Sequence, residues 1–167
     1  MMSDRATRAD GRTDSASRLI KATPAAIYQA FLDPNALVRW LPPSGMTACI
    51  DVFDPREGGE YQLTLTYDRP DHSAPGKTTE HADVTRGRFL QLLSSRQIVQ
   101  SVRFDSVDPK FAGEMRTTWL LEPDPEGSIV TITAENVPVG ITSEEHEAGF
   151  ASTLANLAAF VEGTFRR

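Results

Sequence analysis

Residues 142–165 read TSEEHEAGFASTLANLAAFVEGTF and carry the pattern of one long amphipathic helix. Thr142, followed three positions later by Glu145, is the sequence signature of a capping box and marks the start of this helix. The large apolar residues then recur at helical spacing, as Phe150, Leu154, Leu157, Val161 and Phe165. Alanines beside this apolar stripe would let the helix lie close to a sheet.

Upstream of this helix the apolar period changes to two, which is typical of strands with one buried face. Apolar and polar residues alternate from Tyr61 to Tyr67. We expect a short first strand at 17–22 and further strands at 48–53, 61–67, 83–93, 97–105, 114–122 and 128–135. Because the strands follow one another as hairpins and the helices are segregated, the sequence predicts an α+β domain with a sheet of about six to seven strands.

Two short helices are expected after the first strand, at 24–32 and 34–40. Thr23-Pro24 and Asp33-Pro34 both combine a residue that caps a helix with a proline, which fits the first helical position. Residues 1–14 have almost no apolar content, and we expect them to form a disordered tail. Residues 15–167 are expected to form a single domain.

Composition narrows the class of protein. The chain has 167 residues, of which 40% are hydrophobic, and a formal net charge of −6. This acidic balance argues against nucleic acid as a partner, because phosphate binding needs clustered Lys and Arg. The single cysteine, Cys49, excludes an internal disulfide. No apolar run approaches the ~18 residues of a membrane span, and there is no signal peptide, so we expect a cytoplasmic protein.

Five motifs follow one another along the chain in an order that resembles a known family. They are 21–28 (KATPAAIY), 37–42 (LVRWLP), 54–61 (DPREGGEY), 87–89 (GRF) and 147–150 (EAGF) with Leu154 and Leu157. The chain resembles the SRPBCC or START-like superfamily, and within it the branch related to the activator of heat-shock-protein-ninety ATPase. Phe150 stands where this family commonly carries Trp, and Ala134 where a His is often seen.

The resemblance implies a helix-grip fold, in which a curved antiparallel sheet wraps around the long C-terminal helix and leaves a cavity between them. The candidates for lining this cavity are Trp40, Leu41, Met46, Tyr61, Leu63, Leu65, Phe89, Trp119, Phe150, Leu154 and Leu157. A filled core would show the same apolar periodicity, so each residue is a candidate for either role.

Three residues are candidate polar anchors for a ligand. If Arg103 or Arg116 points inward, its guanidinium would bind a carboxylate or phenolate; the alternative is that both face water. His81 forms a small cluster with Glu80 and Asp83, whereas the other two histidines, His72 and His146, are interpreted as solvated surface residues. We expect no metal, cofactor or catalytic residue, because no paired His or Cys spacing and no nucleophile motif occurs.

The resemblance and the apolar pattern together favour a domain that binds a small apolar or aromatic molecule. Two alternatives remain: an enzyme of the cyclase or hydrolase kind that uses the same cavity, and a co-chaperone-like domain that binds a chaperone. Without a recognisable acid–base pair, the enzyme ranks lower. Self-association into a homodimer, through an exposed face of the sheet or of a helix, also remains open.

Overall fold

A computed structural model describes residues 11–68 and 82–166. Seven strands form one antiparallel sheet in the order β1-β7-β6-β5-β4-β3-β2. The elements along the chain are β1 (Arg12–Ile20), α2 (Pro24–Leu32), α3 (Pro34–Trp40), β2 (Met46–Phe53), β3 (Glu60–Tyr67), β4 (Ala82–Leu93), β5 (Gln97–Phe104), the 3₁₀ turn η1 (Pro109–Phe111), β6 (Met115–Asp124), β7 (Gly127–Val137) and α4 (Ser143–Arg166).

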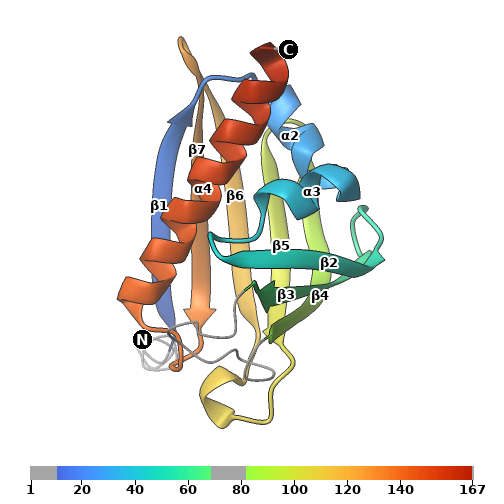
Figure 1. Cartoon of the computed structure of the whole chain (residues 1–167), viewed down its shortest axis with the longest axis vertical. Helices are drawn as coiled ribbons and strands as arrows, with labels where there is room; N and C mark the ends of the chain where they lie inside the picture. The colour runs from blue at the N-terminus through green and yellow to red at the C-terminus, as the bar shows by residue number, and fades with distance from the viewer. Residues whose placement is uncertain (1–10, 69–81, 167) are drawn as a thin grey trace, which may run out of the picture.

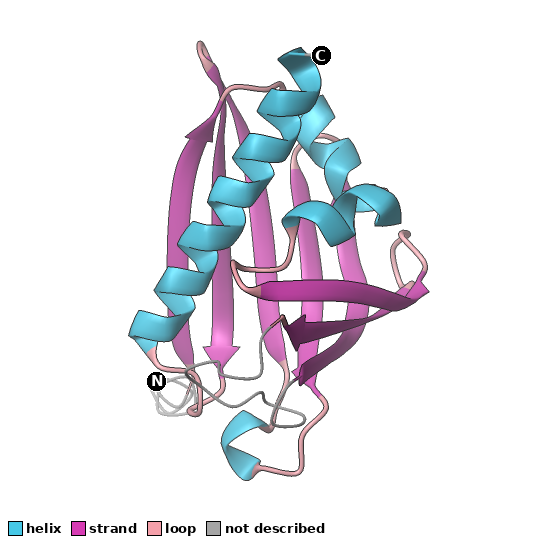
Figure 2. Ribbon diagram, viewed as in Figure 1, coloured by secondary structure: helices cyan, strands magenta, loops and turns pink. Residues whose placement is uncertain are grey.

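All three α-helices lie on one face of the sheet (Figures 1 and 2). α4 runs diagonally across the strands β1, β7 and β6, and α2 and α3 lie beside its C-terminal half. The sheet curves strongly, so that β2 and β3 turn across the front of the molecule (Figure 1). This is the predicted α+β helix-grip arrangement of a curved sheet and a long C-terminal helix.

The helix starts follow from their capping residues. The Thr23 hydroxyl accepts a hydrogen bond from the Ala26 amide, and the Asp33 carboxylate accepts one from the Asn35 amide. At α4 the Glu145 amide donates to the Thr142 hydroxyl at 3.1 Å, and the Glu145 carboxylate accepts from the Thr142 amide at 3.4 Å. Each contact satisfies a backbone N–H that has no partner inside its helix. The predicted capping box is therefore confirmed.

A glycine lets two strands and a tyrosine meet at the centre of the sheet. Gly87 of β4 lies opposite Tyr61 of β3. The Tyr61 hydroxyl donates a hydrogen bond of 2.6 Å to the Ser101 carbonyl of β5 and so crosses directly over Gly87. A Cβ at position 87 would lie 1.8 Å from that carbonyl oxygen. Only glycine leaves room for this contact.

The first strand begins earlier than the sequence indicates. β1 starts at Arg12, and Arg12 and Asp14 pair with Val137 and Ala134 of β7. The predicted tail boundary at residue 14 is therefore wrong for Arg12–Asp14; residues 1–10 lie outside the described part of the chain. Polar composition does not exclude a strand here, because the backbone pairs with β7 and the side chains find partners on α4.

The core lies between the concave face of the sheet and the helices. Inward-facing residues of β6 and β7, among them Trp119, Leu121, Val130 and Ile132, are at most 4% exposed. They pack with α2, α3 and α4 in one cluster of buried side chains. Met115, Thr117, Trp119 and Leu121 alternate along β6 and are all buried, so they share its inner face.

Candidate functional site

The residues predicted to line a cavity divide into two sets. Most are buried in the single core cluster, namely Trp40, Tyr61, Leu63, Phe89, Trp119, Phe150, Leu154 and Leu157. The other three, Leu41, Met46 and Leu65, are only half-buried. The two sets differ in how far the rest of the molecule covers their side chains.

The buried set packs around two aromatic clusters. Phe31, Trp40 and Trp119 meet edge to face, with ring centroids 4.8–5.9 Å apart. Phe89 contacts Tyr61 and Phe53 in the same way, at 5.5 and 5.8 Å. The Trp40 indole N–H donates to the Ala30 carbonyl at 3.0 Å, so this polar atom is satisfied within the core. These side chains pack against one another and hold the fold.

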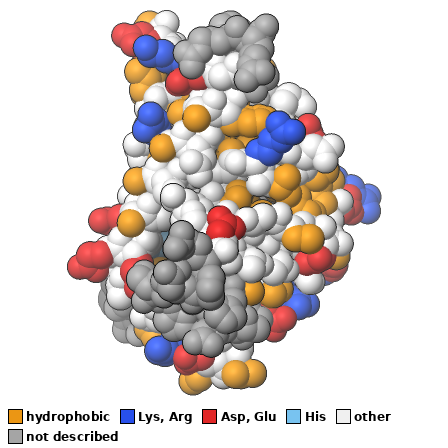
Figure 3. Space-filling model, viewed as in Figure 1, with side chains coloured by type: hydrophobic (Ala, Val, Ile, Leu, Met, Phe, Trp, Pro, Cys, Tyr) orange, Lys and Arg blue, Asp and Glu red, His pale blue; other side chains and the backbone are white. Residues whose placement is uncertain are grey.

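The half-buried set marks where the concave face becomes accessible. Tyr61 and Leu63 are 4% and 7% exposed, whereas Leu65 and Tyr67, on the same side of β3, are only half-buried. Met46 pairs with Tyr67 across the β2–β3 ladder. We call Leu41, Met46, Leu65 and Tyr67 the rim. In the space-filling view, hydrophobic side chains are exposed on the face that carries α4, α3 and β2 (Figure 3).

Burial and two acidic residues act on the hydroxyl of Tyr67. Burial raises the pKa of Tyr67, and the negative charges of Asp83 and Glu145 raise it further. Asp83 lies opposite Leu65 in the β3–β4 ladder and is 5% exposed. Glu145 belongs to the first turn of α4. Tyr67 therefore stays protonated at neutral pH and lies near acidic side chains of β4 and of the first turn of α4.

The two arginines predicted as polar anchors lie on the outer side of the sheet. Arg103 and Arg116 are both exposed, so neither adopts the inward orientation considered from the sequence. In the strand register, Arg103 lies opposite Arg86 of β4 and Arg116 lies opposite Glu135 of β7, on the outer side of the sheet. The reason is strand alternation: Arg116 lies between the inward-facing Met115 and Thr117. His81 lies outside the described residues.

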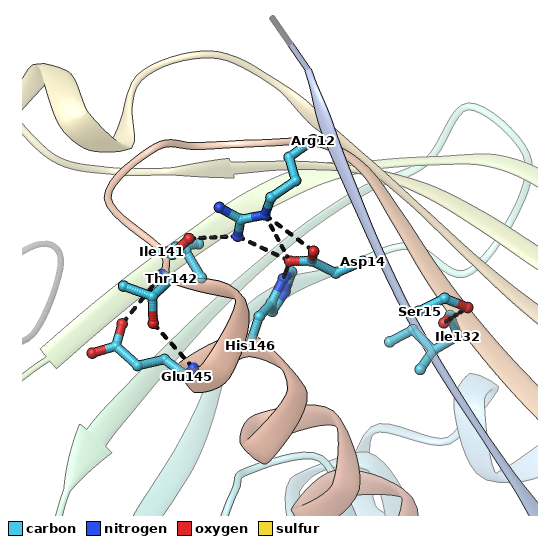
Figure 4. A network of polar contacts seen from close by, with 8 residues as sticks. All are labelled: Arg12, Asp14, Ser15, Ile132, Ile141, Thr142, Glu145 and His146. Atoms are coloured by element: carbon cyan, nitrogen blue, oxygen red, sulfur yellow. Dashed lines mark hydrogen bonds and ion pairs between the residues drawn. The ribbon is translucent and has the colours of Figure 1, made fainter. Parts of the chain in front are cut away.

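A partly buried polar network joins the start of β1 to the start of α4 (Figure 4). The Arg12 guanidinium donates to both Asp14 carboxylate oxygens, with the shortest contact at 2.9 Å, and also to the Ile141 carbonyl. His146 Nδ1 lies 2.7 Å from the second Asp14 oxygen. The side chains of Asp14 and His146 are 5% and 12% exposed. The interpretation of His146 as a solvated residue is therefore wrong.

The charge state of Asp14 determines the tautomer of His146. The hydrogen bond from Arg12 holds the pKa of the Asp14 carboxyl below its ordinary value, against the opposing effect of burial, and the bond with His146 lowers it further. A deprotonated carboxylate can only accept hydrogen bonds. Nδ1 of His146 therefore carries the proton that is shared with Asp14.

Replacing Asp14 by asparagine is expected to lower the free energy of unfolding at neutral pH by about 2 kcal/mol, because His146 and the partly exposed Arg12 both lose a charged acceptor that is itself buried. A carboxyl whose pKa is lowered on folding contributes stability above its unfolded pKa of about 4, and this contribution is lost as the pH falls through its folded pKa. The difference between the two proteins should therefore shrink below about pH 4, as measured by urea unfolding at a series of pH values.

The matched control is Asp105→Asn, which removes an ion pair with Arg86. The side chains of Arg86 and Asp105 are both about half exposed. Its effect should be much smaller, because exposed pairs contribute little. Equal losses in the two variants would contradict a special contribution from Asp14.

An open hollow of about 710 Å³ lies at the end of the sheet away from Asp14 and His146. It is bounded by Thr23–Ala25 at the start of α2, Ser95 and Arg96 between β4 and β5, and residues 120–123 of β6. None of the eleven predicted lining residues contributes to it. It is therefore distinct from the space between the sheet and α4.

Within the described ranges, no group of three or more His, Cys, Asp or Glu side chains is placed to hold a metal ion. None of the helices in that part of the chain is both long and apolar enough to cross a membrane.

Comparisons with known proteins agree with this architecture. The model of the family described as "Activator of Hsp90 ATPase homolog 1-like protein" matches residues 21–162. A crystal structure of a protein from Chromobacterium violaceum is 33% identical, covers 90% of this chain and 96% of its own, and has a TM-score of 0.80. No curated protein matches the chain.

More distant structures share the fold alone. The AHSA1-like protein from Aeromonas hydrophila, solved by NMR, is 19% identical over 93% of this chain and 96% of its own, with a TM-score of 0.69. A protein from Rhodobacter sphaeroides is 18% identical over 90% and 92%, with a TM-score of 0.72.

Proposed function

Because this chain belongs to the family of activator of Hsp90 ATPase homolog 1-like proteins, we propose that it binds a small apolar or aromatic molecule between the concave face of the sheet and α4. One observation carries the proposal. Along β3 the inward-facing side chains change from buried, at Tyr61 and Leu63, to half-buried, at Leu65 and Tyr67. The apolar face thus continues beyond the packed core onto the rim.

The chemistry of the rim suits such a ligand. Small-molecule sites are mostly apolar and carry a few polar groups that fix orientation. Leu41, Met46 and Leu65 supply apolar surface, and the protonated Tyr67 hydroxyl is a polar group among them. Covering this surface would stabilise the complex by about 25 cal/mol for each Å² of apolar area removed from water.

The proposal is tested first by native mass spectrometry of protein purified without detergent, followed by denaturation and identification of any released compound. A stoichiometric small molecule would support it. In parallel, the neutral aromatic probe N-phenyl-1-naphthylamine is titrated and its fluorescence recorded. An empty protein that neither binds the probe nor gains thermal stability across a panel of lipids and aromatic compounds would refute the proposal.

A pair of variants on one strand locates the site. Replacing Leu65 by glutamine is expected to weaken binding of the probe at least about tenfold, because a polar amide would enter the apolar rim. Thr66, the next residue, is exposed on the opposite side of β3. Thr66→Gln should leave the affinity within about twofold. Equal effects of the two substitutions would place the probe elsewhere.

A chaperone-binding role is the second candidate, and an exposed apolar tip favours it. Val107 is fully exposed and Val139 is 76% exposed, and the loops that carry them are joined by the hydrogen bond from the Gly140 amide to the Lys110 carbonyl at 2.9 Å. Adding the protein to a purified chaperone of the heat-shock-protein-ninety class should then raise its ATPase rate. An unchanged rate, or an equal rise with Val107→Asp and Val139→Asp combined, would count against this role for the tip.

A further inference from the structure

The polar network between β1 and α4 lies next to an aromatic residue of the concave face. His146 and Phe150 are one helical turn apart on α4, and their rings stack with centroids 4.1 Å apart at an angle of 41°. Phe150 is 8% exposed and belongs to the core cluster. A hydrogen bond that fixes the imidazole ring therefore also limits where the phenyl ring can lie.

Asp14 is well placed to fix that imidazole. It lies opposite Ala134 of β7, which in turn lies opposite Thr117 of β6, so these three side chains form one row across the concave face. Arg12 binds both oxygens of Asp14 and also the Ile141 carbonyl, just before α4 begins (Figure 4). The Asp14 carboxylate is thus bound both by Arg12 of β1 and by His146 in the first turn of α4.

The same turn of α4 faces the rim. Glu145, next to His146, is close enough to Tyr67 for its charge to raise the pKa of the tyrosine. Figure 1 shows the start of α4 at the same end of the molecule as the end of β3. The first turn of α4 therefore lies near the rim, and in the proposed site it forms the wall on that side.

We propose that Asp14 is a positioning residue of the ligand site: through its hydrogen bond with His146 it fixes the first turn of α4 and the ring of Phe150, and so sets the shape of the wall opposite the rim. This inference rests on the proposed function. Asp14 does not touch the ligand; it acts through His146. Asp14 of β1 and His146 of α4 are 132 positions apart in the sequence. Their hydrogen bond connects the edge strand of the sheet to the proposed site.

The test is a double-mutant cycle on the whole chain, with N-phenyl-1-naphthylamine as the probe. Asp14→Asn removes the charged acceptor. His146→Phe keeps an aromatic ring for stacking on Phe150 but removes the donor. Each substitution is expected to weaken probe binding by about fivefold, and the double variant by about the same factor, because residues that act through one contact are not additive.

A structural control separates positioning from general loss of stability. Ser128 is fully buried on β7 and donates a 2.7 Å hydrogen bond to the Ala22 carbonyl, at the other end of the β1–β7 ladder. Ser128→Ala should lower the melting temperature by an amount similar to Asp14→Asn, since both remove a buried hydrogen bond. Its probe affinity should stay within about twofold of the unaltered protein.

Nitrogen-15 NMR of His146 supplies a readout that stability does not move. At about pH 8, where imidazoles are ordinarily neutral, the proton should lie on Nδ1 in the unaltered protein. In Asp14→Asn the amide can donate to Nδ1, so the proton should move to Nε2. A proton on Nε2 alone in the unaltered protein would overturn the proposed contact even if the affinities had changed, because an ionised carboxylate cannot donate to Nδ1.

The outcomes distinguish this inference from the proposed function. Absence of probe binding to the unaltered protein would refute the proposed function and this inference together. Binding that is equally strong in Asp14→Asn and in the unaltered protein would overturn the positioning role alone. Losses that multiply in the double variant would show that Asp14 and His146 act separately, which also overturns it.

Discussion

Replacing Trp40 by alanine is expected to lower the free energy of unfolding by about 3–5 kcal/mol, as measured by urea denaturation. The indole is completely buried at the end of α3 and contacts both Phe31 and Trp119. Its removal would leave a cavity lined by those two rings and would deprive the Ala30 carbonyl of its donor.

Two further variants test whether the loss in Trp40→Ala comes from the packed core. Trp40→Phe keeps an aromatic ring but loses the indole N–H, and it should cost about 1–2 kcal/mol. Leu41→Ala removes a neighbouring side chain that is only half-buried and should cost less than Trp40→Ala. If Trp40→Ala cost no more than Leu41→Ala, Trp40 would line an open space and its assignment to the packed core would be wrong.

Replacing Gly87 by alanine should have an effect of similar size for a different reason. The new Cβ would lie 1.8 Å from the Ser101 carbonyl oxygen and 2.8 Å from the Tyr61 hydroxyl. Either the strands separate or the buried hydrogen bond between those groups breaks, so we expect a loss of about 3 kcal/mol or more. Urea unfolding measures the loss, and near-ultraviolet circular dichroism should report the altered setting of Tyr61.

The matched control is Gly149→Ala in α4, where a Cβ would meet no atom within 4 Å. A glycine inside a helix is unfavourable, so this substitution should stabilise the protein by about 0.5–1 kcal/mol. A similar loss at both positions would show that the close approach at Gly87 is not the cause.

The fold could be predicted from the sequence because its signals are local. Thr23-Pro24, Asp33-Pro34 and the Thr142–Glu145 capping box each act within a few residues, and all three form as expected. Alternation along Tyr61–Tyr67 likewise depends only on neighbouring positions. The boundaries of β1 and β7 were missed at their polar ends, where pairing between Arg12 and Val137 extends the ladder without an apolar pattern.

The candidate site was only partly predictable, because its polar groups come together through the fold. Nothing in the neighbourhood of Asp14 or of His146 indicates that they meet, since 132 positions separate them. Tyr67 carried a usable signal, because it continues the alternation of Tyr61, Leu63 and Leu65. Arg116 also carried a usable signal: it lies an odd number of positions from Trp119, a predicted lining residue, so alternation along one strand places it on the opposite face.

The pairing of the first strand with the last has a consequence for how the protein folds in the cell. β1 joins the sheet only through β7, and Ile20 lies beside Ser128. A ribosome must therefore synthesise more than a hundred further residues before β1 finds its neighbour, and α4, which also packs on β1, emerges later still. A distant pairing of this kind costs more loop-closure entropy than the consecutive hairpins of β2 to β7, so we expect it to form late. Until then the concave apolar face stays uncovered, so the nascent chain should be a substrate for chaperones that hold exposed hydrophobic segments.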